Sequence, residues 1–219
     1  MKKQLVLLHS VGFIAELFKP LLAEYLPGLD CVHIVDEGIL RETAKAGGSS
    51  PGVVRRVASQ ALLAADLRPD IILFTCSATS PAVDIVRPMV TMPVLKIDDP
   101  LAEAAVRSGR AIAFIGTTRG SLGPGVDLIH ARATEAGKTV TVTPVLLEAA
   151  FTARQAGNID EHDHIVGDTV REMAAGYDAV VLGQASMAHL AEPLGRAAGK
   201  PVLGSVMLCI DALREMAAA

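Results

Sequence analysis

The sequence predicts an α/β protein built from two pseudo-symmetric lobes. Two observations carry this prediction. Short apolar, β-branched runs alternate along the chain with longer stretches whose apolar residues recur at helical spacing, which is typical of βαβ units and parallel sheets. The second half of the chain also repeats the element order of the first half. Each lobe is therefore expected to hold a mainly parallel four-stranded sheet flanked by helices.

The first half predicts four strands and the helices that connect them. Strands are expected where apolar runs are short and bounded by turn residues, at 5–8, 31–35, 71–74 and 93–95. Helices are expected where apolar residues repeat every three or four positions, at 14–25, 39–46, 53–67 and 81–90. Ser80 is the expected N-cap of the last of these helices, with Pro81 as its first residue.

The second half predicts the same alternation. Its expected strands are 111–115, 139–145, 179–182 and 201–203. Its expected helices are 98–108, 122–136, 147–155, 160–175, 187–198 and 206–216.

The two halves superpose in sequence without a gap. Residues 70–79 lie over residues 178–187, an offset of 178 − 70 = 108. The same offset places Cys76 on Gln184 and residues 93–95 on 201–203. We therefore expect a first lobe of residues 1–97 plus 206–219 and a second lobe of residues 98–205.

The composition of the chain limits what it can bind. Of its 219 residues 51% are hydrophobic but only 3% aromatic, so the core is aliphatic. The net charge is −4 without a basic cluster, so neither nucleic acid nor a membrane surface is an expected partner. No stretch is long and apolar enough to span a bilayer, and the apolar run 5–8 is too short for a signal peptide. Three widely spaced cysteines fit reduced thiols in a cytoplasmic protein.

Cys76 stands where chemistry is expected in such a fold. It follows a buried strand, within the small and mostly polar run Thr75 to Thr79. In open α/β sheets, ligands bind at the carboxyl ends of the strands. The amides of the helix that follows would favour a thiolate or a bound carboxylate near this thiol.

Four strand-end turns are expected to line a common cleft, and their small, hydroxyl-bearing residues suit a small carboxylate ligand. Neither a Gly-x-Gly-x-x-Gly pattern nor a phosphate-loop lysine is present, so a nucleotide is not expected. The candidate catalytic residues are Cys76 and Gln184. The candidate substrate-binding residues are His9, Ser10, Ser77, Ala78, Thr79, Thr117, Thr118, Ala185 and Ser186.

Several of these residues allow a second interpretation. His9 has a pKa suited to a proton donor, although a strand-end histidine is more often structural. Thr117 and Thr118 can cap a helix as well as bind a ligand. Gln184 either donates a hydrogen bond to a substrate carboxylate or only stabilises its turn. His162 and His164 stand at alternate helical positions that point apart, so no metal site is expected.

In order along the chain, the strand-Thr75-Cys-Ser-Ala turn, the Gly116-Thr-Thr turn and the segment Leu-Gly-Gln-Ala-Ser-Met-Ala resemble the aspartate/glutamate/hydantoin racemase superfamily. The resemblance spans nearly the whole chain. It implies two flavodoxin-like lobes with the active site in the cleft between them, and chemistry without a cofactor. It also implies two cysteines, one per lobe, that remove and return a proton on opposite faces of a substrate carbon.

This chain departs from that pattern at the second cysteine. Cys76 matches the first one, but Gln184 occupies the second position and cannot transfer a proton. Cys31 opens a strand and Cys209 lies inside a helix, so neither replaces it. We therefore expect an isomerase or racemase-like enzyme that uses one thiol on a small carboxylate, amino-acid or hydantoin-like substrate.

Three other activities stay open. A single thiol also suffices for an arylmalonate-type decarboxylase or a maleate-type cis-trans isomerase. A protein that binds a small carboxylate without catalysis would keep the same residues. The sequence leaves a homo-oligomer possible.

Overall fold

The computed structural model describes residues 2–218, which divide into two compact units. Unit 1 takes in the chain up to Ile97 and again from Cys209 onward, and unit 2 is Asp98–Leu208. Each unit contains one four-stranded sheet in which every strand pair is parallel. The predicted fold class is confirmed, with sheets that are wholly rather than mainly parallel.

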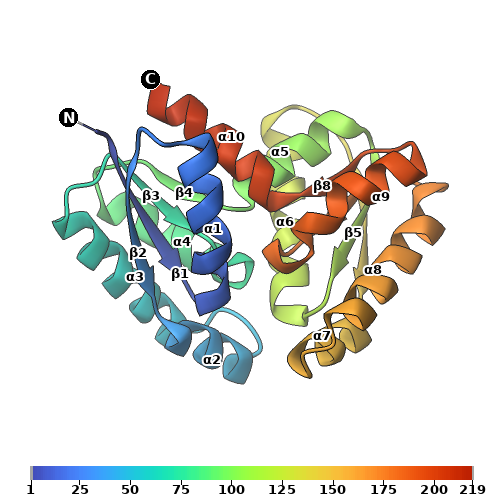
Figure 1. Cartoon of the computed structure of the whole chain (residues 1–219), viewed down its shortest axis with the longest axis horizontal. Helices are drawn as coiled ribbons and strands as arrows, with labels where there is room; N and C mark the ends of the chain where they lie inside the picture. Colours follow the sequence, from blue (N-terminus) through green and yellow to red (C-terminus); the bar gives the residue numbers. More distant parts are fainter. Residues whose placement is uncertain (1, 219) are drawn as a thin grey trace. The chain divides into compact units, whose positions relative to one another are not determined.

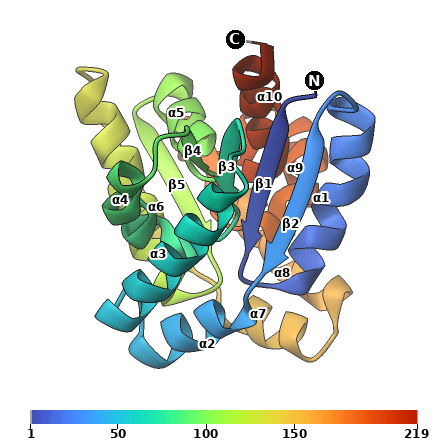
Figure 2. The same ribbon diagram turned by 90° about the vertical axis from the view of Figure 1, so that its left-hand side faces the viewer.

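The sheet of unit 1 has the order β2-β1-β3-β4. Its strands are β1 (Gln4–His9), β2 (Asp30–Val35), β3 (Ile71–Phe74) and β4 (Val94–Lys96). The connecting elements are α1 (Gly12–Tyr25), α2 (Glu37–Ala46), α3 (Pro51–Asp66), the 3-10 turn η1 (Ser77–Thr79), α4 (Ser80–Val86) and the 3-10 turn η2 (Arg87–Met89). Figure 2 shows α1 on one side of this sheet and α3 and α4 on the other.

Side-chain alternation along the strands builds the core of unit 1. Val6 and Leu8 of β1 point to one face together with Ile72 and Phe74 of β3, and α3 and α4 cover this face with Val, Ala and Ile side chains. Leu5 and Leu7, on the opposite face, are fully buried as well. A strand buried on both faces needs a continuous apolar run, which is what the sequence of β1 provides.

The sheet of unit 2 repeats this arrangement with the order β6-β5-β7-β8. Its strands are β5 (Ala111–Gly116), β6 (Thr141–Leu146), β7 (Ala179–Leu182) and β8 (Val202–Gly204). Its other elements are α5 (Asp99–Ser108), α6 (Arg119–Glu135), α7 (Glu148–Gln155), α8 (Ile159–Ala174), the 3-10 segment η3 (Ala185–Leu190) and α9 (Ala191–Ala198), and α10 (Ser205–Ala218) continues from β8 into unit 1. Figure 1 colours these elements from green to red.

Two apolar layers cover the sheet of unit 2. Ile112 and Phe114 of β5 pack against α5 and α6, and Ala113 and Ile115 pack against α8 and η3. The ring of Phe114 needs bare backbone on two sides. A Cβ atom would lie 2.1 Å from Phe114 Cζ at Gly125 of α6, and 2.3 Å from it at Gly183. Gly183 therefore lets the chain turn closely over the sheet one residue before Gln184.

Two predicted helices differ from the observed elements. The segment expected as one helix over 81–90 consists of η1, α4 and η2, and Ser80 lies inside α4 instead of capping it. Pro88 falls in η2, where it lacks the N–H that would continue α4. The helix expected from residue 187 begins as η3, and α9 starts only at Ala191.

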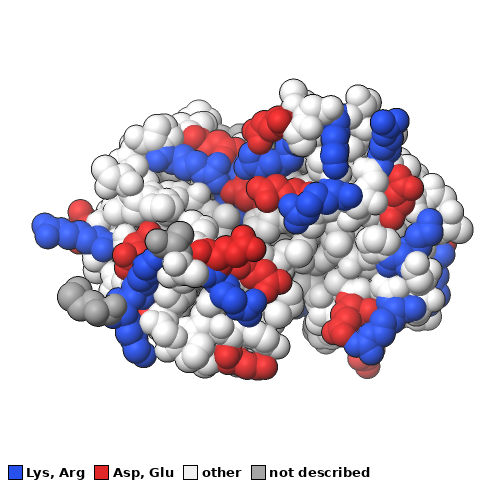
Figure 3. All heavy atoms as spheres, turned by 90° about the horizontal axis from the view of Figure 1, so that it is seen from above, with Lys and Arg blue, Asp and Glu red and all other residues white. Residues whose placement is uncertain are grey.

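The surface carries both charge signs side by side. On the face seen in Figure 3, lysines and arginines alternate with aspartates and glutamates without a large patch of one sign. Within residues 2–218, none of the helices combines the length and the apolar character needed to cross a bilayer.

Candidate functional site

Cys76 lies at the carboxyl edge of the unit 1 sheet, two residues after β3. Its backbone is extended (φ −117°, ψ 110°), and its carbonyl oxygen accepts hydrogen bonds from Thr79 N (3.1 Å) and Thr79 Oγ1 (2.7 Å). These bonds form η1 and fix the direction of the turn. Cys76 is half-buried and lines a cavity of about 250 Å³ at this edge, as do Ser10 and Thr79. The thiol therefore borders a space that a small group can enter.

A ladder of hydrogen bonds supports the strand end that carries Cys76. Thr75 Oγ1 donates to the Leu8 carbonyl (3.1 Å) and contacts His9 Nδ1 (2.9 Å). Because the hydroxyl hydrogen is used on Leu8, Thr75 must accept from His9, which places the hydrogen of His9 on Nδ1. His9 Nε2 is then an acceptor, so His33 Nδ1 donates to it (2.9 Å). This ladder, His33–His9–Thr75, fixes both imidazoles in one tautomer.

The environment keeps both histidines neutral. Burial lowers the pKa of His9 to about 4, with further contributions from His33 and Lys19. Burial and Lys19 also lower the pKa of His33, while Glu16 opposes them. The single N–H of His9 is engaged with Thr75, so in this arrangement the residue positions the Cys76 strand end and has no proton left to donate.

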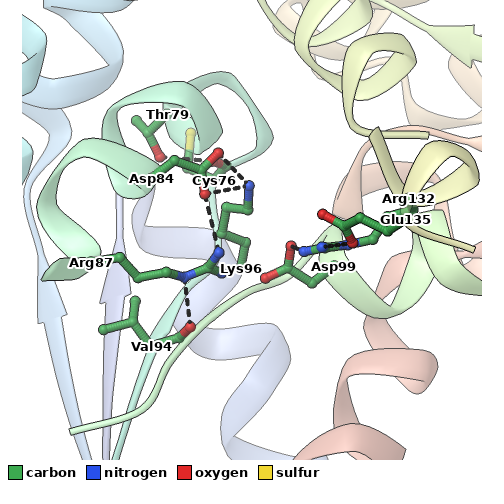
Figure 4. A network of polar contacts seen from close by, with 9 residues as sticks. All are labelled: Cys76, Thr79, Asp84, Arg87, Val94, Lys96, Asp99, Arg132 and Glu135. Atoms are coloured by element: carbon green, nitrogen blue, oxygen red, sulfur yellow. Dashed lines mark hydrogen bonds and ion pairs between the residues drawn. The ribbon is translucent and has the colours of Figure 1, made fainter. Parts of the chain in front are cut away.

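A cluster of charges lies at the end of the neighbouring strand β4. Lys96 is almost fully buried, and its Nζ donates to both carboxylate oxygens of Asp84 at 2.8 Å (Figure 4). Arg87 also donates to Asp84 (3.1 Å) and to the Val94 carbonyl (3.1 Å). These contacts tie α4, which follows the Cys76 turn, to β4. Asp84 thereby faces two cations in this cluster.

Gln184 occupies the corresponding place in unit 2, two residues after β7. Its Oε1 accepts from Thr117 N (2.6 Å) and from Thr117 Oγ1 (2.8 Å). Thr117 itself is buried at the end of β5. The two bonds orient the amide so that its Nε2 is the atom with hydrogens to offer. Gln184 can thus donate a hydrogen bond to a carboxylate or carbonyl oxygen but cannot act as a base.

The other unit 2 candidates lie on the same two strand-end turns. Thr118 is the N-cap residue of α6 and contacts Ser121 Oγ (2.9 Å), so capping and ligand contact compete for its hydroxyl. Ala185 and Ser186 begin η3. The far end of η3 is held by His189, which contacts the Asp163 carboxylate (2.8 Å).

The two units match residue by residue at these strand ends. Leu8 pairs with Phe74 in unit 1 as Ile115 pairs with Leu182 in unit 2, so Cys76 and Gln184 each follow the matched position by two residues. The amino ends of the matched strands agree as well. Asp70 accepts from Gln4 N (2.7 Å), and Asp178 accepts from Arg110 N (2.7 Å) and Ala111 N (2.9 Å).

The remaining predicted residues fall as follows. Ser77, Ala78 and Thr79 form η1 and are buried, as is Ser10 after β1. All three cysteines are thiols. Cys209 is fully buried in α10, and burial together with the neighbouring Asp30 raises the pKa of Cys31. No group of three His, Cys, Asp or Glu side chains within residues 2–218 has the geometry to hold a metal.

The sequence analysis missed three residues that shape the unit 1 site. His33 supports His9, and Asp36 and Gln60 line the cavity next to Cys76. His33 interrupts an otherwise apolar strand two positions before its end, which is the one signal that could have indicated its role. The contact of Gln60 depends on how α3 packs, and no sequence pattern reports it.

Comparisons with known proteins agree on one family. The family model described as Asp/Glu/Hydantoin racemase matches residues 28–213. A search of curated proteins gives no match. Among solved structures, the aspartate racemase of Picrophilus torridus is 13% identical with a TM-score of 0.73, covering 99% of this chain and 94% of its own. The glutamate racemase of Aquifex pyrophilus is 21% identical with a TM-score of 0.64, covering 97% and 83%. The allantoin racemase of Klebsiella pneumoniae is 16% identical with a TM-score of 0.68, covering 99% and 88%. At these identities the structures support the fold alone.

Proposed function

The chain belongs to the Asp/Glu/hydantoin racemase family, and on that premise we propose that it is a cofactor-independent isomerase in which one thiol, Cys76, acts on a small substrate. The proposed substrate is a carboxylate, an amino acid or a hydantoin-like compound. One observation carries the proposal. Cys76 ends β3 of unit 1 beside a cavity, whereas the matched position of unit 2 holds Gln184, an amide anchored by Thr117.

The proposed chemistry needs one group that exchanges a proton with carbon. The Cys76 thiolate takes the hydrogen on the carbon next to a carbonyl, so that the C–H bond breaks and an S–H bond forms. The electron pair of the C–H bond moves onto the carbonyl oxygen. Gln184 Nε2 donates a hydrogen bond to the substrate, where an amide donor stabilises the negative oxygen. Reprotonation of the carbon from the opposite face regenerates the carbonyl with inverted configuration, and water supplies that proton.

Other candidate residues serve this step indirectly. His9 and Thr75 hold the strand end that carries Cys76. The backbone amides of η1 and η3 are proposed to bind substrate oxygens, together with the hydroxyls of Ser10 and Thr118. Replacing the side chains of Ala78 and Ala185 would therefore reveal little about their roles.

A substrate panel in ²H₂O tests the proposal. Single enantiomers of amino acids, 2-substituted carboxylates and 5-substituted hydantoins are incubated with the protein and followed by proton NMR and chiral chromatography. We expect one class to lose its α-hydrogen signal and its optical purity together, and Cys76→Ala to abolish both changes. Arylmalonates and maleate are included in the panel.

Three outcomes would contradict the proposal. A product lighter by CO₂ and carrying deuterium would assign a decarboxylase. Geometric isomerisation of maleate would assign a cis-trans isomerase. Binding of a panel member without any turnover would assign a binding protein.

A further inference from the structure

The cavity beside Cys76 has a wall that the proposed mechanism does not use. Apolar side chains of the strands and of α2 form much of this cavity, namely Leu8, Ile34, Ile39 and Phe74. Asp36, which follows β2, and Gln60 of α3 are its polar residues farthest in sequence from the Cys76 turn. Their hydrogen-bonding capacity decides which chemical group can enter.

Asp36 is already saturated within unit 1. Its Oδ1 accepts from Gly38 N (3.0 Å) and Arg56 Nη2 (2.8 Å), and its Oδ2 accepts from Arg56 Nε (2.7 Å) and Gln60 Nε2 (3.2 Å). The bidentate Arg56 pair holds the pKa of Asp36 below its usual range and cancels its charge. Asp36 therefore offers the cavity neither an open acceptor nor a net negative charge.

These bonds leave one atom of Gln60 unused. Nε2 must face Asp36, because the opposite orientation would set the amide oxygen against a carboxylate. Oε1 is then buried, and within residues 2–218 it has no hydrogen-bond partner. A buried acceptor without a donor destabilises the protein, and a ligand that brings a donor removes that cost.

We propose that Gln60 Oε1 is a specificity-determining acceptor that binds a neutral N–H group of the substrate while the reacting carbon lies at Cys76. The inference rests on the proposed function and narrows its substrate to compounds with an amide, lactam or ureido N–H. A carboxylate would place an acceptor against an acceptor. An ammonium group would lose its hydration against apolar walls without a net counter-charge, since Arg56 neutralises Asp36.

Matched pairs of substrates test this acceptor. The probes are 5-substituted hydantoins with free ring nitrogens and the same compounds methylated at N1 or N3. For one of the two positions we expect wild-type kcat/KM to fall about 10- to 100-fold on methylation, as when a hydrogen bond to a buried group is lost. Gln60→Met keeps the length of the side chain without the acceptor, and we expect it to lose most of this preference. Gln155→Met, on the exposed surface of α7, is the matched control and keeps it.

The outcomes separate this inference from the proposed function. If Cys76→Ala is inactive but wild type handles free and methylated nitrogens equally, the Gln60 inference is wrong and the proposed function stands. If Gln60→Met folds and keeps the full preference, the inference is also wrong. If hydantoins are not turned over, their binding to wild type is compared with that of the methylated forms by thermal shift, and equal binding overturns the inference. If Gln60→Met does not fold, Gln60→Leu and the wild-type preference are used for the same decision.

Discussion

At the scale of the residue, the candidate nucleophile differs from the other two cysteines in its surroundings. Cys209 is fully buried, and the raised pKa of Cys31 leaves little thiolate at neutral pH. Cys76 is half-buried and borders a cavity. The same three residue types therefore have three different accessibilities, and only one combines access with a position at a strand end.

This contrast predicts a labelling order. Under limiting iodoacetamide at pH 7.5, we expect the first adduct on Cys76, with Cys31 slower and Cys209 unlabelled until the protein unfolds. Peptide mapping by mass spectrometry identifies the modified residue, and Cys76→Ser serves as the control. Labelling of Cys31 ahead of Cys76 would disagree with this account.

The histidine ladder predicts a pH dependence of stability. The pKa of His9 is about 4 in the folded chain and about 6.5 when unfolded. The unfolded state thus binds the proton first, and stability present above pH 6.5 is lost as the pH falls towards 4. The shift corresponds to about 3 kcal/mol at most. Urea unfolding at several pH values measures it.

The control for this dependence is a variant that cannot titrate. We expect His9→Asn to be less stable at pH 7.5 but to lose less stability between pH 6.5 and 4 than wild type. His130→Asn, at an exposed position of α6, should retain the wild-type slope. An unchanged slope in His9→Asn would show that other groups cause the acid limb.

At the scale of the element, helix α6 approaches β5 closely at a single position. A Cβ atom at Gly125 would lie 2.1 Å from Phe114 Cζ, while one at Gly123 would meet nothing within 4 Å. The two glycines therefore have opposite costs although they are two residues apart in one helix. Helix propensity favours alanine at both, and only packing distinguishes them.

We predict that Gly125→Ala destabilises the protein by about 1–3 kcal/mol, because Phe114 is buried and must shift. Gly123→Ala should stabilise it by about 0.5–1 kcal/mol, because alanine costs less backbone entropy than glycine. The free energy of unfolding in urea is the measurement for both variants. Equal effects of the two changes would contradict the packing described for α6.

Most strands and helices could be predicted because their apolar periodicity is local information. The run 5–8 lies within β1, and the helix predicted over 53–67 matches α3 closely. The 3-10 segments η1 and η3 could not be predicted, since a few small polar residues fit a cap, a turn or a helix equally well. The position of Cys76 at a strand end was predictable for the same local reason.

The contacts of the site required tertiary information. His33 meets His9 only because β1 and β2 pair with Leu7 opposite His33. The bond between Gln60 and Asp36 likewise joins residues 24 positions apart, through the packing of α3. A sequence pattern specifies neither the register nor this packing.

At the scale of the whole molecule, one design occurs twice with different chemistry at its matched strand ends. Both sheets have the same strand order, and Cys76 and Gln184 follow equivalent strands. A thiol exchanges protons with carbon, whereas an amide only donates and accepts hydrogen bonds. The duplication therefore leads us to propose unequal roles for the two residues.

The comparison of two single replacements tests this claim most directly. On a substrate identified from the panel, the rate of α-hydrogen exchange in ²H₂O is measured for wild type, Cys76→Ala and Gln184→Ala. We predict that Cys76→Ala lowers the rate by about 10²–10⁴-fold, the usual contribution of an acid–base group, and that Gln184→Ala mainly raises KM. Full exchange by Cys76→Ala, or an equal loss of kcat in both variants, would contradict the one-thiol account.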